Sequence, residues 1–181
     1  MNVSESYVEM LNRSFRPSQQ EGCRPFPIAS LEITLLHEAQ QRAKEREKAL
    51  FARLCRIFDW KLTRQQRRYY AQSLQDGMTL VLTDLSKSIL WTSHSFLTLT
   101  GYTMGEVLGR TPSLLQGSDT NMSLMRKVGE QLRHARPVNI TTRNHRKNGE
   151  SYLCRIMISP MRNTQGDLTH FLAVEHEVAE A

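Results

Sequence analysis

Glycine and proline are scarce in this chain, with 9 and 6 occurrences among 181 residues. That scarcity excludes collagen-like and low-complexity proteins, which are rich in both residues. No apolar run approaches the roughly 18 residues that span a bilayer, and the first residues lack the basic and apolar segments of a signal peptide. We therefore expect no contact with a membrane and a cytoplasmic location.

Cysteine is also scarce, and its spacing is irregular. Cys23, Cys55 and Cys154 are odd in number, far apart and never arranged as a C-x-x-C pair. This pattern argues against a disulfide framework or a zinc ribbon, so we expect reduced, buried thiols. His170 and His176 would lie about 20 Å apart on one strand, too far apart to share a metal ion. No metal site or haem is expected.

Motifs of known enzyme chemistry are absent as well. The chain has no Ser-His-Asp order, no H-E-x-x-H and no phosphate-binding loop. We therefore expect no catalytic residues and no enzymatic activity. The three residues after Val178 leave no room for a kinase domain. Any output is expected to pass through the N-terminal helices or a partner protein.

The net charge is modest, at +6 from 24 Lys or Arg and 18 Asp or Glu. In the stretch 42–48, basic residues alternate with Glu45 and Glu47, as on a solvated helix face. Only Arg64, Arg67 and Arg68, followed by Tyr69 and Tyr70, resemble a nucleic-acid contact. No helix-turn-helix or zinc-finger pattern accompanies them. Nucleic acid is therefore not an expected partner, although a nucleic-acid-associated regulator stays as the third hypothesis.

The chain divides into three parts by pattern. Residues 1–29 form an arm that is flexible or loosely docked, because Pro25 and Pro27 break any helix. Residues 30–76 form a helical extension: a long helix at 30–59 capped by Ser30, then a helix at 64–75 capped by Thr63. Residues 77–178 form the main domain.

The long helix carries apolar residues every seven positions, with one complementary position, and these predict a homodimer interface: Leu36, Ala43, Leu50, Ile57 and, at the complementary position, Leu54. Gln40 and Glu47 interrupt the second row of the heptad. Docking of the helix onto its own domain is the open alternative. A signalling partner protein is also expected, of unidentified nature.

From Thr79 onward the pattern changes to that of a sheet. Strands are predicted at 79–84, 88–92, 138–146, 150–160 and 168–178, with Asn148-Gly149 as a hairpin turn. Short helical turns fill 93–118, and a longer helix capped by Asp119 or Thr120 runs to about residue 135. Because the βαβ rhythm of a parallel sheet is absent, we predict an α+β fold with one antiparallel sheet.

These segments resemble the PAS sensor domain over residues 74–177. The resemblance rests on several short sequences in order: Val-Leu-Thr-Asp at 81–84, Leu-Thr-Gly-Tyr-Thr at 99–103, Leu-Leu-Gln-Gly-Ser-Asp-Thr at 114–120 and Asn-His-Arg-Lys-Asn-Gly at 144–149. It implies a PAS fold with a five-stranded antiparallel sheet and short helices, preceded by the helical extension.

Within that fold the chain is most similar to the light-oxygen-voltage (LOV) branch, which binds flavin. Of the branch's functional positions, Gln116 and Asn144 match. The adduct-forming cysteine falls on Pro112, the arginine that pairs with the flavin phosphate on Ser113, a ring-reading asparagine on Cys154, and the glutamine facing the flavin on Glu175. The resemblance therefore implies that cysteinyl-adduct photochemistry is absent.

A PAS-type pocket lies between the sheet and the short helices. The ligand-pocket residues that we predict are Leu82, Phe96, Pro112, Leu115, Gln116, Asn144, Cys154, Ile156 and Glu175. The alternative is that the apolar members simply fill the core. Gln116, Asn144 and Glu175 distinguish a ligand pocket from a filled core. Burying any of these polar side chains without a hydrogen-bond partner would cost about 1–3 kcal/mol. In such a site Glu175 could titrate near neutral pH.

The leading hypothesis is a PAS-type sensory module that senses a small ligand or mediates protein–protein interaction, without a catalytic output of its own. No cofactor is the first expectation, and FMN or another flavin is the alternative. In that alternative the chain is a flavin photoreceptor without the adduct cysteine, using Gln116, Asn144 and an electron donor such as Trp91 or a tyrosine.

Overall fold

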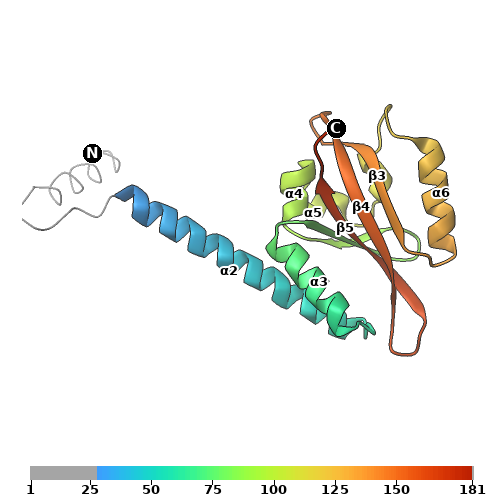
Figure 1. Cartoon of the computed structure of the whole chain (residues 1–181), viewed down its shortest axis with the longest axis horizontal. Coiled ribbons are helices and arrows are strands. Elements are labelled where there is room, and N and C mark those ends of the chain that lie inside the picture. Colours follow the sequence, from blue (N-terminus) through green and yellow to red (C-terminus); the bar gives the residue numbers. More distant parts are fainter. Residues whose placement is uncertain (1–27, 181) are drawn as a thin grey trace, which may run out of the picture. The chain divides into compact units, whose positions relative to one another are not determined.

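The computed structural model describes residues 28–180, so the predicted arm at 1–29 lies almost wholly outside the described residues. Two helices lead into two strands, several short helices, one longer helix and three final strands (Figure 1). The chain divides between Ala39 and Gln40 into two compact units. Every residue from 31 to 39 is exposed. Within the described range, no helix has both the length and the apolar character needed to cross a membrane.

The long helix α2 (Ile28–Ile57) begins two residues earlier than predicted, so Ser30 lies inside the helix and its predicted capping role is wrong. The helix ends in a Schellman turn. Asp59 adopts the left-handed φ of 50°. Its amide donates to the Arg56 carbonyl at 3.2 Å, and the Trp60 amide donates to the Cys55 carbonyl at 3.0 Å.

The second helix α3 (Arg64–Gln75) has the predicted bounds and the predicted cap. The Thr63 hydroxyl accepts from the Gln66 amide at 3.1 Å, and the Gln66 side chain accepts from the Thr63 amide at 2.9 Å. This reciprocal capping box satisfies two helix-end donors. Gly77, with φ at 76°, lets the chain leave the helix and enter the sheet.

Five strands form one antiparallel sheet in the order β2-β1-β5-β4-β3. Their bounds are β1 (Thr79–Thr83), β2 (Ile89–Thr92), β3 (Val138–His145), β4 (Ser151–Arg162) and β5 (Leu168–Glu177). The predicted α+β fold with a five-stranded antiparallel sheet is therefore confirmed. The central strands β1 and β5 pair with each other, although almost 90 residues separate them in sequence.

The segment between β2 and β3 contains α4 (Ser95–Thr100), α5 (Met104–Val107), the 3₁₀ turn η1 (Pro112–Leu115) and α6 (Met122–Arg133). Asn121 caps α6 by accepting from the Leu124 amide at 3.0 Å, so the predicted caps Asp119 and Thr120 are wrong. The Thr120 hydroxyl instead donates to the Arg143 carbonyl at 2.8 Å, which joins this loop to β3.

The two faces of the sheet serve different layers because side chains alternate along each strand. Leu82 and Leu172 point to one face, where they share a core with Phe51 of α2 and Tyr70 of α3. The other face, carrying Val81 and Ala173 among others, is covered by α4, α5, η1 and α6. The C-terminal part of α2 thus docks on its own domain, one of the two outcomes left open by the sequence.

Candidate functional site

A cavity of about 340 Å³ lies between the second face of the sheet and the segment formed by η1 and α6. This volume is at the lower end of the range for small-molecule sites. Its floor is made by inward-pointing side chains of four strands: Val81, Ile140, Ile156, Ile158, Phe171 and Ala173. Leu115 of η1 and Val128 and Leu132 of α6 cover it. The walls are therefore mainly apolar.

Five polar side chains interrupt these walls: Thr83, Gln116, Thr142, Asn144 and Glu175. Thr142 and Glu175 are each only 4% exposed, and in the described part of the chain neither the Thr142 Oγ1 nor the Glu175 Oε2 has a hydrogen-bond partner. Burial raises the pKa of the Glu175 carboxyl to about 7. A buried polar atom without a partner is costly, so these two atoms mark the place where the cavity would receive a polar group.

The edge of the cavity carries a different set of groups. Thr111 and Ser113 line it, and their hydroxyl groups are hydrogen-bonded to each other. Lys87, in the turn between β1 and β2, also lines it. The Lys87 Nζ lies 3.6 Å from the position that a Cβ would occupy on Gly129 of α6. The ammonium group therefore reaches from the sheet turn to the helix.

Six of the nine predicted pocket residues line the cavity: Pro112, Leu115, Gln116, Asn144, Ile156 and Glu175. Leu82 is a correction, because strand alternation directs it to the opposite face against α2 and α3. Phe96 lies on the cavity side of the sheet, but it packs in the core with Val107 and Leu115 and does not line the cavity. Cys154 is fully buried on β4 and does not line the cavity. A ligand-binding role for the six stays a prediction.

Neither described thiol is placed for covalent chemistry in the cavity. Cys55 and Cys154 are both free and buried. Burial raises the pKa of each thiol, and the nearby Glu175 carboxyl raises that of Cys154 further. Both therefore stay protonated and unreactive at neutral pH. At the position where the resemblance places the adduct cysteine, the cavity is lined by Pro112.

Several lining residues escaped the sequence prediction, among them the polar residues Thr142 and Lys87. Thr142 lies two positions before Asn144 on β3, so the period of two along a strand was a sufficient signal for its face. Lys87 gave no such signal, because a lysine in a hairpin turn is ordinarily solvated. Only the approach of the turn to α6 places it at the cavity.

Four of the predicted dimer residues, Leu36, Ala43, Leu50 and Ile57, are exposed on α2. Leu50 and Ile57 are 41% and 62% exposed. Leu54 is a correction, because it is partly buried against the core that α2 shares with the sheet. The exposed residues, called here the α2 stripe (Leu36, Ala43, Leu50, Ile57), stay a predicted interface.

The basic residues of α3 and possible metal ligands add no second site. Arg64, Arg67 and Arg68 are exposed on α3, and the Arg67 Nε donates to the Leu62 carbonyl at 3.4 Å. Across residues 28–180, no three His, Cys, Asp or Glu side chains gather as metal ligands would.

The model of a known family, described as the PAS domain, matches residues 75–180. That match covers more than half of the chain and contains all five strands and the cavity. The chain belongs to the PAS domain family. Its relatives and structural neighbours are LOV domains, which makes it a sensory module of the PAS/LOV type.

Curated and solved relatives agree with this assignment. A blue-light-activated histidine kinase of Brucella canis is 36% identical over 90 residues, which are 50% of this chain but only 18% of the kinase. A solved LOV domain studied with a flavin analogue is 32% identical, with a TM-score of 0.57 over 62% of this chain and 86% of that one. The light-state dimer of the fungal photoreceptor Vivid is 25% identical, with a TM-score of 0.53 over 56% and 78%.

Flavin is the group named for one of these solved structures, and the residues of the cavity fit a flavin in part. The apolar walls and the amides of Gln116 and Asn144 suit a flat ring with polar edges. No thiol of the described chain lines the cavity, and Ser113 stands where the LOV branch has a cationic partner for the phosphate. These residues therefore support non-covalent binding only.

Proposed function

We propose that this PAS domain is a sensor whose cavity holds a small organic ligand. The observation that carries the proposal is the pair of partnerless buried atoms, Glu175 Oε2 and Thr142 Oγ1, in an otherwise apolar cavity of about 340 Å³. Without a ligand each atom destabilises the fold by about 1–3 kcal/mol. A ligand that supplies the missing hydrogen bonds removes this cost and so binds preferentially to the folded domain.

Mass spectrometry of the purified full chain tests this proposal. Native spectra are expected to show a mass above that of the polypeptide, and denaturing spectra the polypeptide alone. The Ala173→Leu variant fills the cavity and should lose the extra mass, whereas Ala52→Leu, on the exposed surface of α2, should retain it. If the wild-type chain has equal native and denaturing masses, the binding of added small molecules is measured. The proposal is contradicted if none of them binds, or if Ala173→Leu does not abolish the binding.

The signal leaves the cavity through the sheet in this proposal. On β5, Ala173 and Glu175 line the cavity, while Leu172 and Val174, which alternate with them along the strand, pack against the layer of α2 and α3. A ligand that shifts β5 therefore changes the packing of these helices. The α2 stripe extends this route to a second copy of the chain, and a homodimer is the state in which we propose that the module works.

A flavin bound without a covalent link is the second candidate, favoured by Gln116 and Asn144 at the cavity and by the LOV relatives. When bound, a flavin supplies photochemical electron uptake. The predicted electron donor Trp91 packs on the opposite face of the sheet, whereas Tyr102 lies on the cavity side. A visible flavin spectrum that bleaches on illumination, and recovers without forming a thiol adduct, is the expected result. A colourless protein that does not take up added FMN would eliminate this candidate.

No catalytic step is assigned to this chain. Some relatives are histidine kinases, but the chain spans only 18% of the Brucella canis protein. We propose that the output passes to a partner protein through the helical layer. A cytoplasmic site of action and the absence of nucleic acid from the partners are further predictions.

A further inference from the structure

The deep end of the cavity offers hydrogen-bond acceptors. Glu175 lies on β5 between Thr79 of β1 and Ile156 of β4, and burial alone accounts for the rise of its carboxyl pKa to about 7. Within residues 28–180, no hydrogen-bond donor reaches its Oε2. A ligand group that donates a hydrogen bond to Oε2 would stabilise the ionised carboxylate. Because the pKa of this carboxyl is about 7, the ionised form is readily populated near neutral pH.

The edge of the cavity offers a cation instead. Lys87 is the only basic residue among those that line the cavity, and it forms no ion pair within residues 28–180. Its backbone adopts a φ of 68° in the β1–β2 turn, and its Nζ lies 3.6 Å from the position that a Cβ would occupy on Gly129. The cavity thus has an acid at its buried end and an unpaired base at its edge.

The third polar group sets the size of the ligand. Thr142 lies on β3 and Glu175 on β5, with β4 between them. Two strand spacings and an offset of two residues along the strands separate their backbones by roughly 12 Å. Because the floor between them is apolar, a flat ring system is the shape that reaches both while covering Ile140 and Ile156.

We propose that the ligand is a flat, mainly apolar ring compound with an N–H donor directed to Glu175 and a carboxylate or phosphate directed to Lys87. The inference rests on the proposed sensor function and adds the chemical class of what is sensed. A purely apolar ligand would leave the Glu175 Oε2 without a partner. A ligand with only an anionic group at the deep end would place two negative charges together in a site of low polarity, where repulsion is strong.

Three related naphthalene compounds test the class with the full chain: one with an amino group and a carboxylate at opposite ends, one with the carboxylate alone and one with the amine alone. Binding is followed by the intrinsic fluorescence of the compounds, after any co-purified ligand has been removed by refolding. We expect the compound with both groups to bind roughly tenfold more tightly than either of the others, because each charge-assisted contact contributes about that factor.

Variants assign the two contacts. Glu175→Gln should weaken the amine-bearing compounds roughly tenfold and leave the carboxylate compound nearly unchanged. Lys87→Gln should weaken both carboxylate-bearing compounds and reduce their dependence on salt. Lys127→Gln and Glu130→Gln are matched controls, because both residues are exposed on α6 and neither lines the cavity.

The outcomes separate this inference from the function on which it rests. Equal affinity for all three compounds, abolished by Ala173→Leu, would overturn the ligand class while the sensor cavity stands. A co-purified compound without an N–H donor or an anionic group would do the same. If no compound binds and no ligand co-purifies, both proposals fail.

Discussion

Glu175 is the buried acid of the cavity. It is 4% exposed, lies in the centre of the sheet and has a carboxyl oxygen without a partner. A glutamine or leucine would be tolerated there at lower cost, since a buried carboxylate loses its hydration. An acid at this position is therefore a stability cost, and a function at the cavity is the reason that we propose for it.

The first prediction is that the free energy of unfolding of the ligand-free protein depends on pH through Glu175. Burial raises the pKa of Glu175 from 4.5 to about 7. Between these values the unfolded chain has released its proton while the folded chain retains it, so stability falls as pH rises. The integrated loss is on the order of 3 kcal/mol, complete above about pH 7.

Urea denaturation from pH 4 to pH 8 measures this loss. Glu175→Gln should remove the contribution and be the more stable protein at pH 8. Glu130→Gln, at an exposed site on α6, should follow the wild-type curve. Identical pH profiles for Glu175→Gln and the wild type would show that the carboxyl is not desolvated.

Helix α2 serves two purposes at the scale of the element. Phe51 and Cys55 face the sheet and are buried, while Leu50 and Ile57 face outward. Phe51 packs its ring against those of Tyr70 and Trp91, with centroids 5.6 and 6.5 Å apart. The helix is therefore part of the domain core along one side and available for a partner along the other.

The second prediction tests the buried side. Phe51→Ala should lower the free energy of unfolding by about 3–5 kcal/mol, because it removes a large buried ring and leaves a cavity. Leu50→Ala, on the neighbouring exposed position, should change it by less than about 0.5 kcal/mol in the monomer. Chemical denaturation at low protein concentration compares the two. A small effect of Phe51→Ala would mean that α2 is not part of the folding unit.

The third prediction tests the exposed side. Ala43 and Ala52 are both exposed on α2, but only Ala43 belongs to the α2 stripe. Ala43→Asp should shift the dimer toward monomer in sedimentation equilibrium, because a carboxylate in a helix interface must be desolvated. Ala52→Asp makes the same substitution off the stripe and should leave the dimer intact. Dimers of equal stability in both variants would refute the stripe as the interface.

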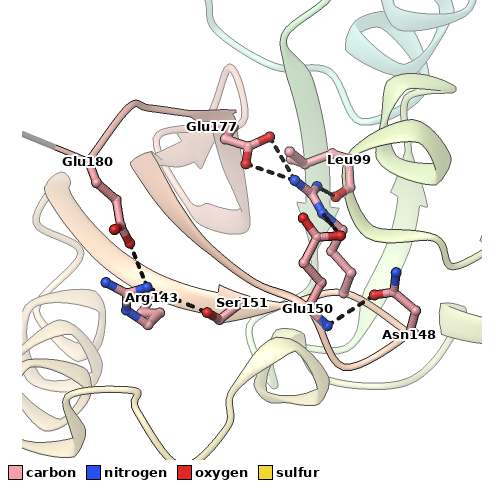
Figure 2. Close-up of polar contacts among 8 residues, drawn as sticks. Leu99, Arg143, Asn148, Glu150, Ser151, Glu177 and Glu180 are labelled. Carbon is pink, nitrogen blue, oxygen red and sulfur yellow. Dashed lines mark hydrogen bonds and ion pairs between the residues drawn. The ribbon is translucent and has the colours of Figure 1, made fainter.

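At the scale of the whole molecule, Arg146 links the β3–β4 turn to α4 and to the end of β5. Figure 2 shows its partners Leu99, Glu150 and Glu177 gathered in one place. From the end of β3 Arg146 forms two hydrogen bonds to the Glu177 carboxylate at the end of β5, at 2.7 and 2.8 Å. It also donates to the carbonyl of Leu99 in α4 and lies 3.5 Å from Glu150 in the β3–β4 turn. These contacts raise the pKa of Arg146, with the Glu177 bond as the largest cause.

The fourth prediction separates this junction from an ordinary surface pair. Arg146→Met should destabilise the domain by about 1–3 kcal/mol, because hydrogen bonds to charged groups are lost at a mostly buried side chain. Hydrogen exchange should quicken at the ends of β5 and α4 together. Arg143→Met, which loses a pair with the exposed Glu180, should cost less than about 1 kcal/mol. Similar effects of both substitutions would deny Arg146 a special role.

Several elements were predictable because their signals are local. The Thr63 cap, the bounds of α3 and the Asn148-Gly149 turn depend on residues within one or two turns of backbone. The caps of α2 and α6 were misassigned, since Ser30, Asp119 and Thr120 have the same chemistry as real caps. What distinguishes Thr120 is a bond to the Arg143 carbonyl, 23 residues away in sequence, and such a contact has no local signature.

The residues of the site also separate into those that the sequence placed correctly and those that only the tertiary structure placed. Alternation along the strands and the resemblance to PAS domains were enough to place Asn144, Ile156 and Glu175 on one face of an antiparallel sheet. Only the tertiary structure decided that Leu82 belongs to the opposite core, that Leu54 packs inward, and that Lys87 reaches the cavity edge at Gly129. The physical reason is that periodicity reports which side of an element a residue occupies, whereas the layer that covers that side is set by packing between segments far apart in the chain.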